Sequence, residues 1–127
     1  MKKRSLVISF LAMASLALAA GKISVSALSK DTDKFDGKPV EVEGKVSGFE
    51  QKTSKKGNKY FIFKMKEGEA SVSVYSHGEP NPAIKDGDKV SVQGIFRKEK
   101  KIGTFTVKNE IDATPVKEKP YGVKKLP

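Results

Sequence analysis

Apolar and polar residues alternate over several short segments of this chain, and this period of two restricts the fold to β-structure. In residues 40–49, valines and glycines hold the even positions and mostly polar residues hold the odd ones. Successive side chains of a strand point to opposite sides, so this pattern indicates a half-buried strand. Gly44 and Gly48 fall on its inward face and predict a bend or bulge there, whereas Phe49 falls on the outward face.

Four further strands are expected along the chain. The alternation continues at 60–66, 70–75 and 89–97, and 104–109 completes the set. The segment 77–88 contains two prolines and two glycines, so it predicts a connector with room for at most one helical turn. Five short antiparallel strands with this interruption predict a closed all-β barrel, because closure removes exposed sheet edges.

The inward faces of these strands define an expected core. It consists of Val40, Val42, Val46, Phe61, Phe63, Met65, Val72, Val74, Val90, Val92 and Phe96. An entry segment, 20–35, precedes the strands, and a short helix within it would end near Gly37. Ser26 is the candidate N-cap of this helix, with Val25, Leu28 and Phe35 facing the core.

The first residues have the form of a secretory signal peptide. Lys2, Lys3 and Arg4 precede an apolar run, and Ala17-Leu18-Ala19 offers a cleavage site. The run is about 15 residues long, short of the roughly 20 that span a bilayer. We therefore expect cleavage after residue 19, no integral membrane span afterwards, and an exported protein of the periplasm or the extracellular space. The chain has no cysteine, so neither a cysteine-linked lipid nor a disulfide is expected.

The exported part is strongly basic. Loss of residues 1–19 removes three basic residues and no acidic ones, which lowers the formal net charge from +10 to +7. Anionic polymers and anionic membrane surfaces are therefore both candidate partners. Lysines gather in the expected loops 51–59 and 98–103, which join the first strand to the second and the fourth to the fifth. Their placement favours a binding role, and simple solubility in turns is the alternative.

Four stretches resemble an OB-fold nucleic-acid-binding domain of the anticodon-binding type, which is found in some aminoacyl-tRNA synthetases and as an accessory domain of DNA polymerases and helicases. They are VEVEGKVSGF, SKKGNKYFIFKMKEGEASVSVY, IKDGDKVSVQGIF and GTFTVKNEI. The resemblance covers residues 36–112 and implies a five-stranded OB-fold barrel. The chain then divides into a signal peptide 1–19, the entry segment 20–35, an OB-fold domain 36–113 and a flexible, disordered basic tail 114–127.

The resemblance also implies a ligand face across the second and third strands, between the two lysine-rich loops. Tyr60 and Tyr75 would stack bases there and Lys64 would meet a phosphate, although ordinary strand packing is an equal alternative for the tyrosines. Ile62 stands where many relatives carry a stacking phenylalanine, and it has no π face. The full candidate set is Lys52, Lys55, Lys56, Lys59, Tyr60, Ile62, Lys64, Ser73, Tyr75, Arg97, Lys98, Lys100 and Lys101.

No catalytic constellation is visible in the sequence. His77 is the only histidine, and Asp86 and Asp88 flank Gly87 in what reads as a turn. We expect no enzyme activity, no metal, no cofactor and no small-molecule substrate, and we expect a monomer. The leading hypothesis is a binding module for single-stranded nucleic acid or another polyanion. Two alternatives remain, namely a protein or envelope glycan bound on the same face, and membrane attachment through the basic segment 117–125.

Overall fold

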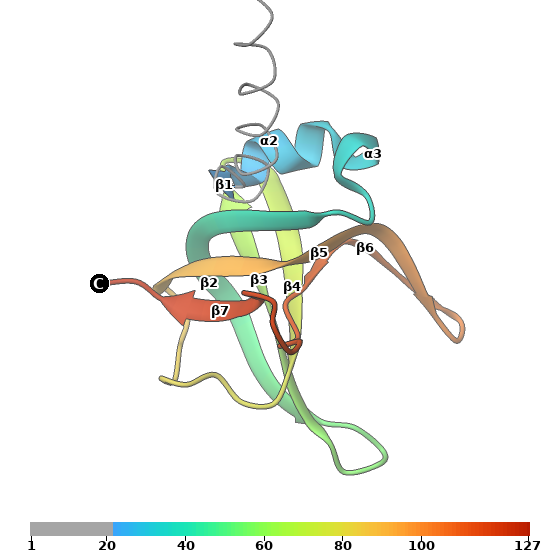
Figure 1. Cartoon of the computed structure of the whole chain (residues 1–127), viewed down its shortest axis with the longest axis vertical. Coiled ribbons are helices and arrows are strands. Elements are labelled where there is room, and N and C mark those ends of the chain that lie inside the picture. The colour runs from blue at the N-terminus through green and yellow to red at the C-terminus, as the bar shows by residue number, and fades with distance from the viewer. Residues whose placement is uncertain (1–21) are drawn as a thin grey trace, which may run out of the picture.

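Five strands close into a ring in the computed structural model, which describes residues 22–127. The predicted signal peptide lies outside the described residues. The ring contains β2 (Pro39–Thr53), β3 (Lys59–Glu67), β4 (Ala70–His77), β5 (Lys89–Ile102) and β6 (Phe105–Asp112). Its order is β2-β3-β4-β6-β5, and β5 pairs again with β2 (Figure 1). All pairs are antiparallel except β4 and β6, which are parallel because the connector after His77 carries the chain across the ring before β5 begins.

The strand β2 serves two neighbours because it bends in the middle. Its first half pairs with β5 and its second half with β3. The register with β3 shifts between Ser47 and Glu50, and Gly48 has a φ of +65°, so the predicted bulge is confirmed. The extra residue reverses the alternation, and Phe49 therefore turns toward the core, with its ring 5.8 Å from that of Phe61. The prediction that Phe49 faces outward is wrong for this reason.

Two hairpins project from the ring as paired strands, where the sequence predicted longer loops (Figure 1). In the β2–β3 hairpin Thr53 pairs with Lys59, which leaves only residues 54–58 for the turn. In the β5–β6 hairpin the pairing continues as far as Ile102 and Phe105. The expected basic loop 98–103 is therefore mostly strand, and successive lysines in it point to opposite sides.

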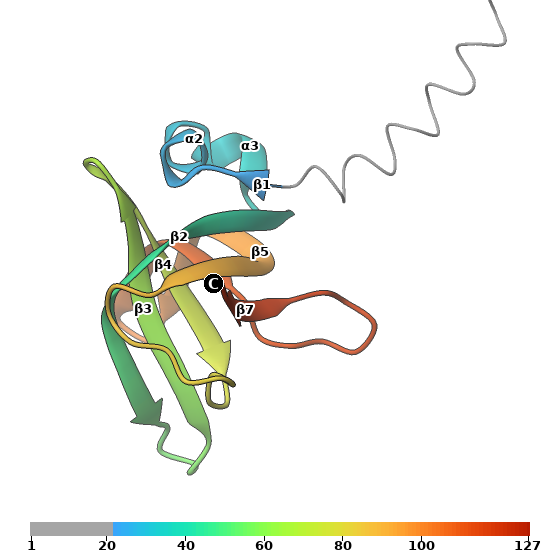
Figure 2. The ribbon, with the colours of Figure 1, turned by 90° about the vertical axis from the view of Figure 1, so that its left-hand side faces the viewer.

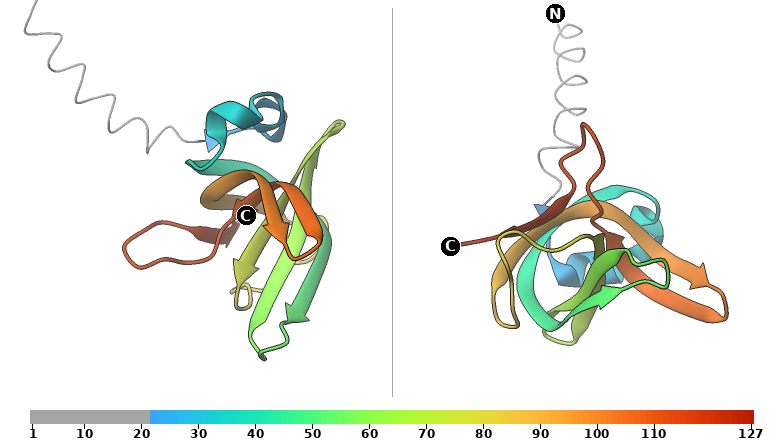
Figure 3. Two further views of the ribbon diagram at one scale, coloured as in Figure 1. Left: turned by 90° about the vertical axis from the view of Figure 1, so that its right-hand side faces the viewer. Right: turned by 90° about the horizontal axis from the view of Figure 1, so that it is seen from below.

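The core fills the ring as the alternation predicted. Every residue of the expected core is buried, and Val25, Leu28, Ile84, Ile111 and Ala113 join it. Two short helices, α2 (Val25–Lys30) and α3 (Thr32–Phe35), cover one end of the ring (Figure 2). Seen from the other end, the helices lie behind the strands (Figure 3, right).

The N-cap of helix α2 lies two residues before the predicted one. The side chain of Ser24, and not that of Ser26, accepts a hydrogen bond from the Ala27 backbone N–H at 3.0 Å. The N–H of Ser26 instead donates to the Glu67 carboxylate at 2.9 Å, and Glu67 ends β3. This contact ties the helix to the β3–β4 turn.

Two additional strands lie at the edges of this architecture. β1 (Lys22–Ile23) pairs in parallel with the first half of β2, and β7 (Gly122–Lys125) pairs antiparallel with the first half of β5. The prediction that the tail is disordered is therefore wrong for residues 122–125, which form β7. Composition alone suggested disorder, but the free edge of β5 supplies a pairing partner that lies far away in sequence.

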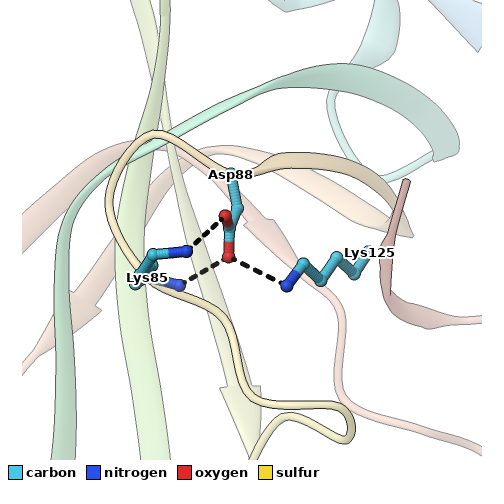
Figure 4. Close-up of polar contacts among 3 residues, drawn as sticks. All are labelled: Lys85, Asp88 and Lys125. Carbon is cyan, nitrogen blue, oxygen red and sulfur yellow. Dashed lines mark hydrogen bonds and ion pairs between the residues drawn. The ribbon is translucent and has the colours of Figure 1, made fainter. Parts of the chain in front are cut away.

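An acidic side chain fastens β7 to the ring (Figure 4). The Asp88 carboxylate accepts hydrogen bonds from the backbone N–H of Lys85 at 3.0 Å and from its ammonium at 3.1 Å. The ammonium of Lys125, on β7, lies 3.6 Å away. The backbone N–H of Lys85, then its ammonium, and finally the charge of Lys125 hold the pKa of Asp88 below its ordinary value of 3.8.

This contact predicts an acid-dependent loss of stability. A carboxyl whose pKa is lowered by folding stabilises the fold above its ordinary pKa, and the contribution is lost as the pH falls through the lowered value. The urea midpoint of the parent should therefore fall more steeply than that of Asp88→Asn between pH 5 and about pH 2. Glu69→Gln removes an exposed carboxyl that makes no ion pair among residues 22–127 and is the matched control. Parallel curves for the parent and Asp88→Asn would contradict the assignment.

Candidate nucleic-acid interface

A groove of about 950 Å³ crosses the outward face of β3 and β4. Its lining includes residues of both hairpins that project from the ring. Phe61, Phe63 and Met65 point into the ring, so the intervening residues of β3 form the floor of the groove. Side chains from β2 and from the β5–β6 hairpin form its walls. The predicted site residues that line it are Lys52, Tyr60, Ile62, Lys64, Ser73, Tyr75 and Lys100.

The floor carries a pair of neighbouring tyrosines. The rings of Tyr60 and Tyr75 have centroids 5.6 Å apart and are tilted by 36°. His77 extends this aromatic surface, with an edge-to-face contact to Tyr75 at 5.7 Å. Ile62 lies directly opposite Tyr75 in the β3–β4 register and adds an apolar contact beside it. Such a surface can receive the faces of planar rings.

The groove is less basic than the sequence suggested. The ammonium of Lys52 lies 3.5 Å from the Glu50 carboxylate, and that of Lys100 lies 2.6 Å from the Glu110 carboxylate. Among the described residues, Lys64 and the neighbouring Lys66 form no ion pair. The uncompensated positive charge of the groove therefore comes from the floor, on β3, and not from the loops.

The remaining predicted lysines lie elsewhere. Lys98 binds the Asp33 carboxylate of α3, which raises the pKa of Lys98, and its backbone N–H donates to Asp36 at 2.8 Å. Lys59 lies 3.5 Å from the Glu79 carboxylate. The other predicted residues outside the groove lining are Lys55 and Lys56, in the β2–β3 turn, and Arg97 and Lys101, on β5.

The β5–β6 hairpin adds apolar side chains that the sequence reading missed. Ile102 and Phe105 line the groove with 52% and 73% of their surface exposed, and Val107 lies beside them. Ile102 pairs with Phe105, and Lys100 with Val107, so these residues share one face of the hairpin. The spacing of Phe105 and Val107 is the sequence signal for this face, but the extension of the hairpin beyond the ring was not anticipated.

A compact cluster forms where this hairpin meets the groove floor. The ammonium of Lys100 lies 4.5 Å from the centroid of the Tyr75 ring and also contacts Glu110, which is only 5% exposed. Burial, and then the negative charges of Asp112 and Glu110, raise the pKa of Tyr75. The tyrosine hydroxyl therefore remains protonated at neutral pH and can both donate and accept hydrogen bonds.

Two further features of residues 22–127 bear on the chemistry of the site. No three His, Cys, Asp or Glu side chains come together in this range as a metal site would require. None of its helices has the length and apolar character needed to cross a bilayer.

Solved structures of known proteins share this architecture. A lipoprotein from Klebsiella pneumoniae, assigned as nucleic-acid-binding, matches at a TM-score of 0.56 and 18% identity, covering 87% of this chain and 96% of that one. The OB domain of a Thermoplasma acidophilum protein matches at 0.50 and 15% identity, covering 83% of this chain and 86% of that one. An aspartyl-tRNA synthetase assigned in Leishmania major matches at 0.51 and 21% identity, covering 82% of this chain but only 19% of the synthetase.

No protein-family model and no curated protein matches the chain. At these identities the structural likeness is one of fold, and the fold is an OB fold. The resemblance seen in the sequence is thereby confirmed at the level of the fold.

Proposed function

We propose that this OB-fold domain is a non-enzymatic module that binds single-stranded nucleic acid, or another extended polyanion, across β3 and β4. One observation carries the proposal: the Tyr60–Tyr75 pair and the unpaired ammonium groups of Lys64 and Lys66 share one open groove. Aromatic rings stack unpaired bases, and lysines beside them bind the phosphates that connect those bases. The assignment of the Klebsiella pneumoniae neighbour as nucleic-acid-binding supports the same choice.

The geometry favours a single strand over a duplex. The rings of Tyr60 and Tyr75 lie on the floor of the groove, and a base reaches them only when it is not stacked inside a helix. Since only two lysines of the groove are unpaired, its charge supports contact with a few phosphates. A stretch of few nucleotides, held by stacking and by modest ionic contacts, is the ligand that these features fit.

We propose that the protein is exported and acts outside the cytoplasm. The basic start, the apolar run and the Ala17-Leu18-Ala19 site of the sequence support export, and the Klebsiella pneumoniae neighbour is a lipoprotein. We further propose that the domain acts as a monomer, because the ring is closed by its own strands and needs no second chain.

A protein partner on the same face is the alternative that a specific observation favours. Ile102 and Phe105 expose apolar surface at the hairpin, and apolar surface of this kind often marks a protein-binding site. The two alternatives differ in their dependence on salt. Release of counterions makes nucleic-acid binding strongly salt-dependent, whereas apolar contacts are much less so.

The experiment is a titration of the domain with a labelled single-stranded oligonucleotide at several salt concentrations. Each phosphate contact contributes about 0.7 to the slope of log K against log salt, so Lys64→Ala with Lys66→Ala should lower the slope by about 1.4. The double variant Lys101→Ala with Lys108→Ala carries the same charge change outside the groove and should leave the slope unchanged. Heparin should compete better than a neutral glycan.

Equal slopes for the two double variants would contradict the proposal. Binding that is insensitive to salt and to heparin, yet lost in Phe105→Ala, would favour the protein partner instead.

A further inference from the structure

A carboxylate lies buried in the groove where a polyanion is expected to bind. Glu110, on β6, is 5% exposed, and its Oε1 atom accepts no aligned hydrogen bond from any described group. Its partner there is the Lys100 ammonium, at a distance of 2.6 Å but outside hydrogen-bond geometry. Burial of a charged group with an incomplete set of hydrogen bonds is costly. This carboxylate therefore retains the capacity to accept hydrogen bonds from a ligand.

The position of Glu110 within the sheet gives the groove two chemically different sides. Lys64 pairs with Ser73, and Ser73 pairs with Glu110, so the three residues form one row across β3, β4 and β6. At the usual strand spacing the row spans about 10 Å. Phosphates are attracted to Lys64 at one end and repelled by Glu110 at the other. A bound strand thus places its backbone over β3 and directs its bases toward β6.

The base that points toward β6 meets Tyr75 and Glu110 together. Tyr75 is the neighbour of Ser73 on the same face of β4, and the Lys100 ammonium bridges the Tyr75 ring and the Glu110 carboxylate. The Lys100 ammonium is a point charge on a flexible stem, so it can leave this pair for solvent when a base enters the groove from β3. Its departure uncovers the Tyr75 ring for stacking and leaves the carboxylate in need of a new donor.

We propose that Glu110 reads the base that stacks on Tyr75, by accepting a hydrogen bond from an amino group on its edge. The inference rests on the proposed function and adds a base preference to it. An ionised carboxylate only accepts hydrogen bonds. It therefore binds the N4 amino group of cytosine and repels the O4 carbonyl of uracil or thymine at the same place. The groove prefers bases that carry an amino group.

The test compares deoxycytidine and deoxyuridine strands of equal length at neutral pH. A hydrogen bond to a charged group favours the deoxycytidine strand by about tenfold in affinity. In Glu110→Gln the ratio falls close to one, because the amide both accepts from N4 and donates to O4. Lys101→Ala, outside the groove, keeps the ratio of the parent. Circular dichroism establishes that each variant is folded.

A change in the ligand makes the test independent of whether Glu110→Gln folds. Strands of N4,N4-dimethyldeoxycytidine lack the amino hydrogens, and the parent protein should bind them about tenfold less tightly than deoxycytidine strands. Equal binding of deoxycytidine and deoxyuridine strands overturns the inference and leaves the proposed function intact. An unchanged ratio in Glu110→Gln, with both affinities raised, also overturns it and makes Glu110 an anchor for Lys100 only. Failure of every strand to bind overturns both proposals.

Discussion

Replacement of Gly94 by alanine is expected to destabilise the domain by about 3 kcal/mol. A Cβ atom at this position would lie 2.1 Å from the carbonyl oxygen of Asp112 and 2.8 Å from the Cα atom of Ala113. Both are backbone atoms next to the crossing of β5 and β6, so neither strand can move without loss of ladder hydrogen bonds. Urea unfolding followed by circular dichroism measures the loss.

Gly44 provides the matched control for this substitution. It also lies in a ring strand, but a Cβ atom there meets the side-chain sulfur of Met65 at 3.3 Å. A flexible methionine can shift by the few tenths of an ångström required, so Gly44→Ala should cost less than about 1.5 kcal/mol. Similar losses of stability in the two variants would contradict the view that close backbone contact makes glycine necessary at position 94.

Phe63→Ala is expected to cost about 3–5 kcal/mol, because it leaves a large cavity in the core. Phe63 is 2% exposed, and its ring stacks on that of Phe61 at 6.3 Å. Phe105→Ala removes the same atoms from an exposed position on the β5–β6 hairpin and should change stability by no more than about 0.5 kcal/mol. Guanidinium unfolding of both variants tests the pair. A loss well under 1 kcal/mol for Phe63→Ala would mean that the faces of β3 are reversed.

The ring and its core could be predicted because the period of two is a local property. Whether Phe63 or Lys64 faces inward depends only on its strand neighbours, and the structure confirms the assignment for every predicted core residue. The same reasoning failed at Phe49, where a single additional residue reversed the alternation. It also failed at the chain end, because a strand such as β7 exists only where a distant edge receives it.

The charge of the groove could not be predicted, because it depends on partners far apart in the chain. Lys98 binds Asp33, 65 residues away, and Lys59 lies beside Glu79. The alternation within the β5–β6 hairpin then separates Lys100 from Lys101. Sequence composition counts these lysines alike, whereas the fold compensates the charge of some and directs others away from the groove. The aromatic floor was easier to locate, since its position follows from the faces of β3 and β4.

The placement of the two edge strands determines where a tag or a solid support can be attached to the domain without covering the groove. β1 and β7 carry the ends of the described chain, and neither contributes a residue to the groove. The C-terminal end points away from both projecting hairpins (Figure 1), so an affinity tag, a linker or a solid support joined after residue 127 would leave the groove accessible. The same holds for a tether at residue 22. Surface-based measurements can thus use either end of the described domain, and agreement between the two orientations would establish that the attachment does not interfere with binding.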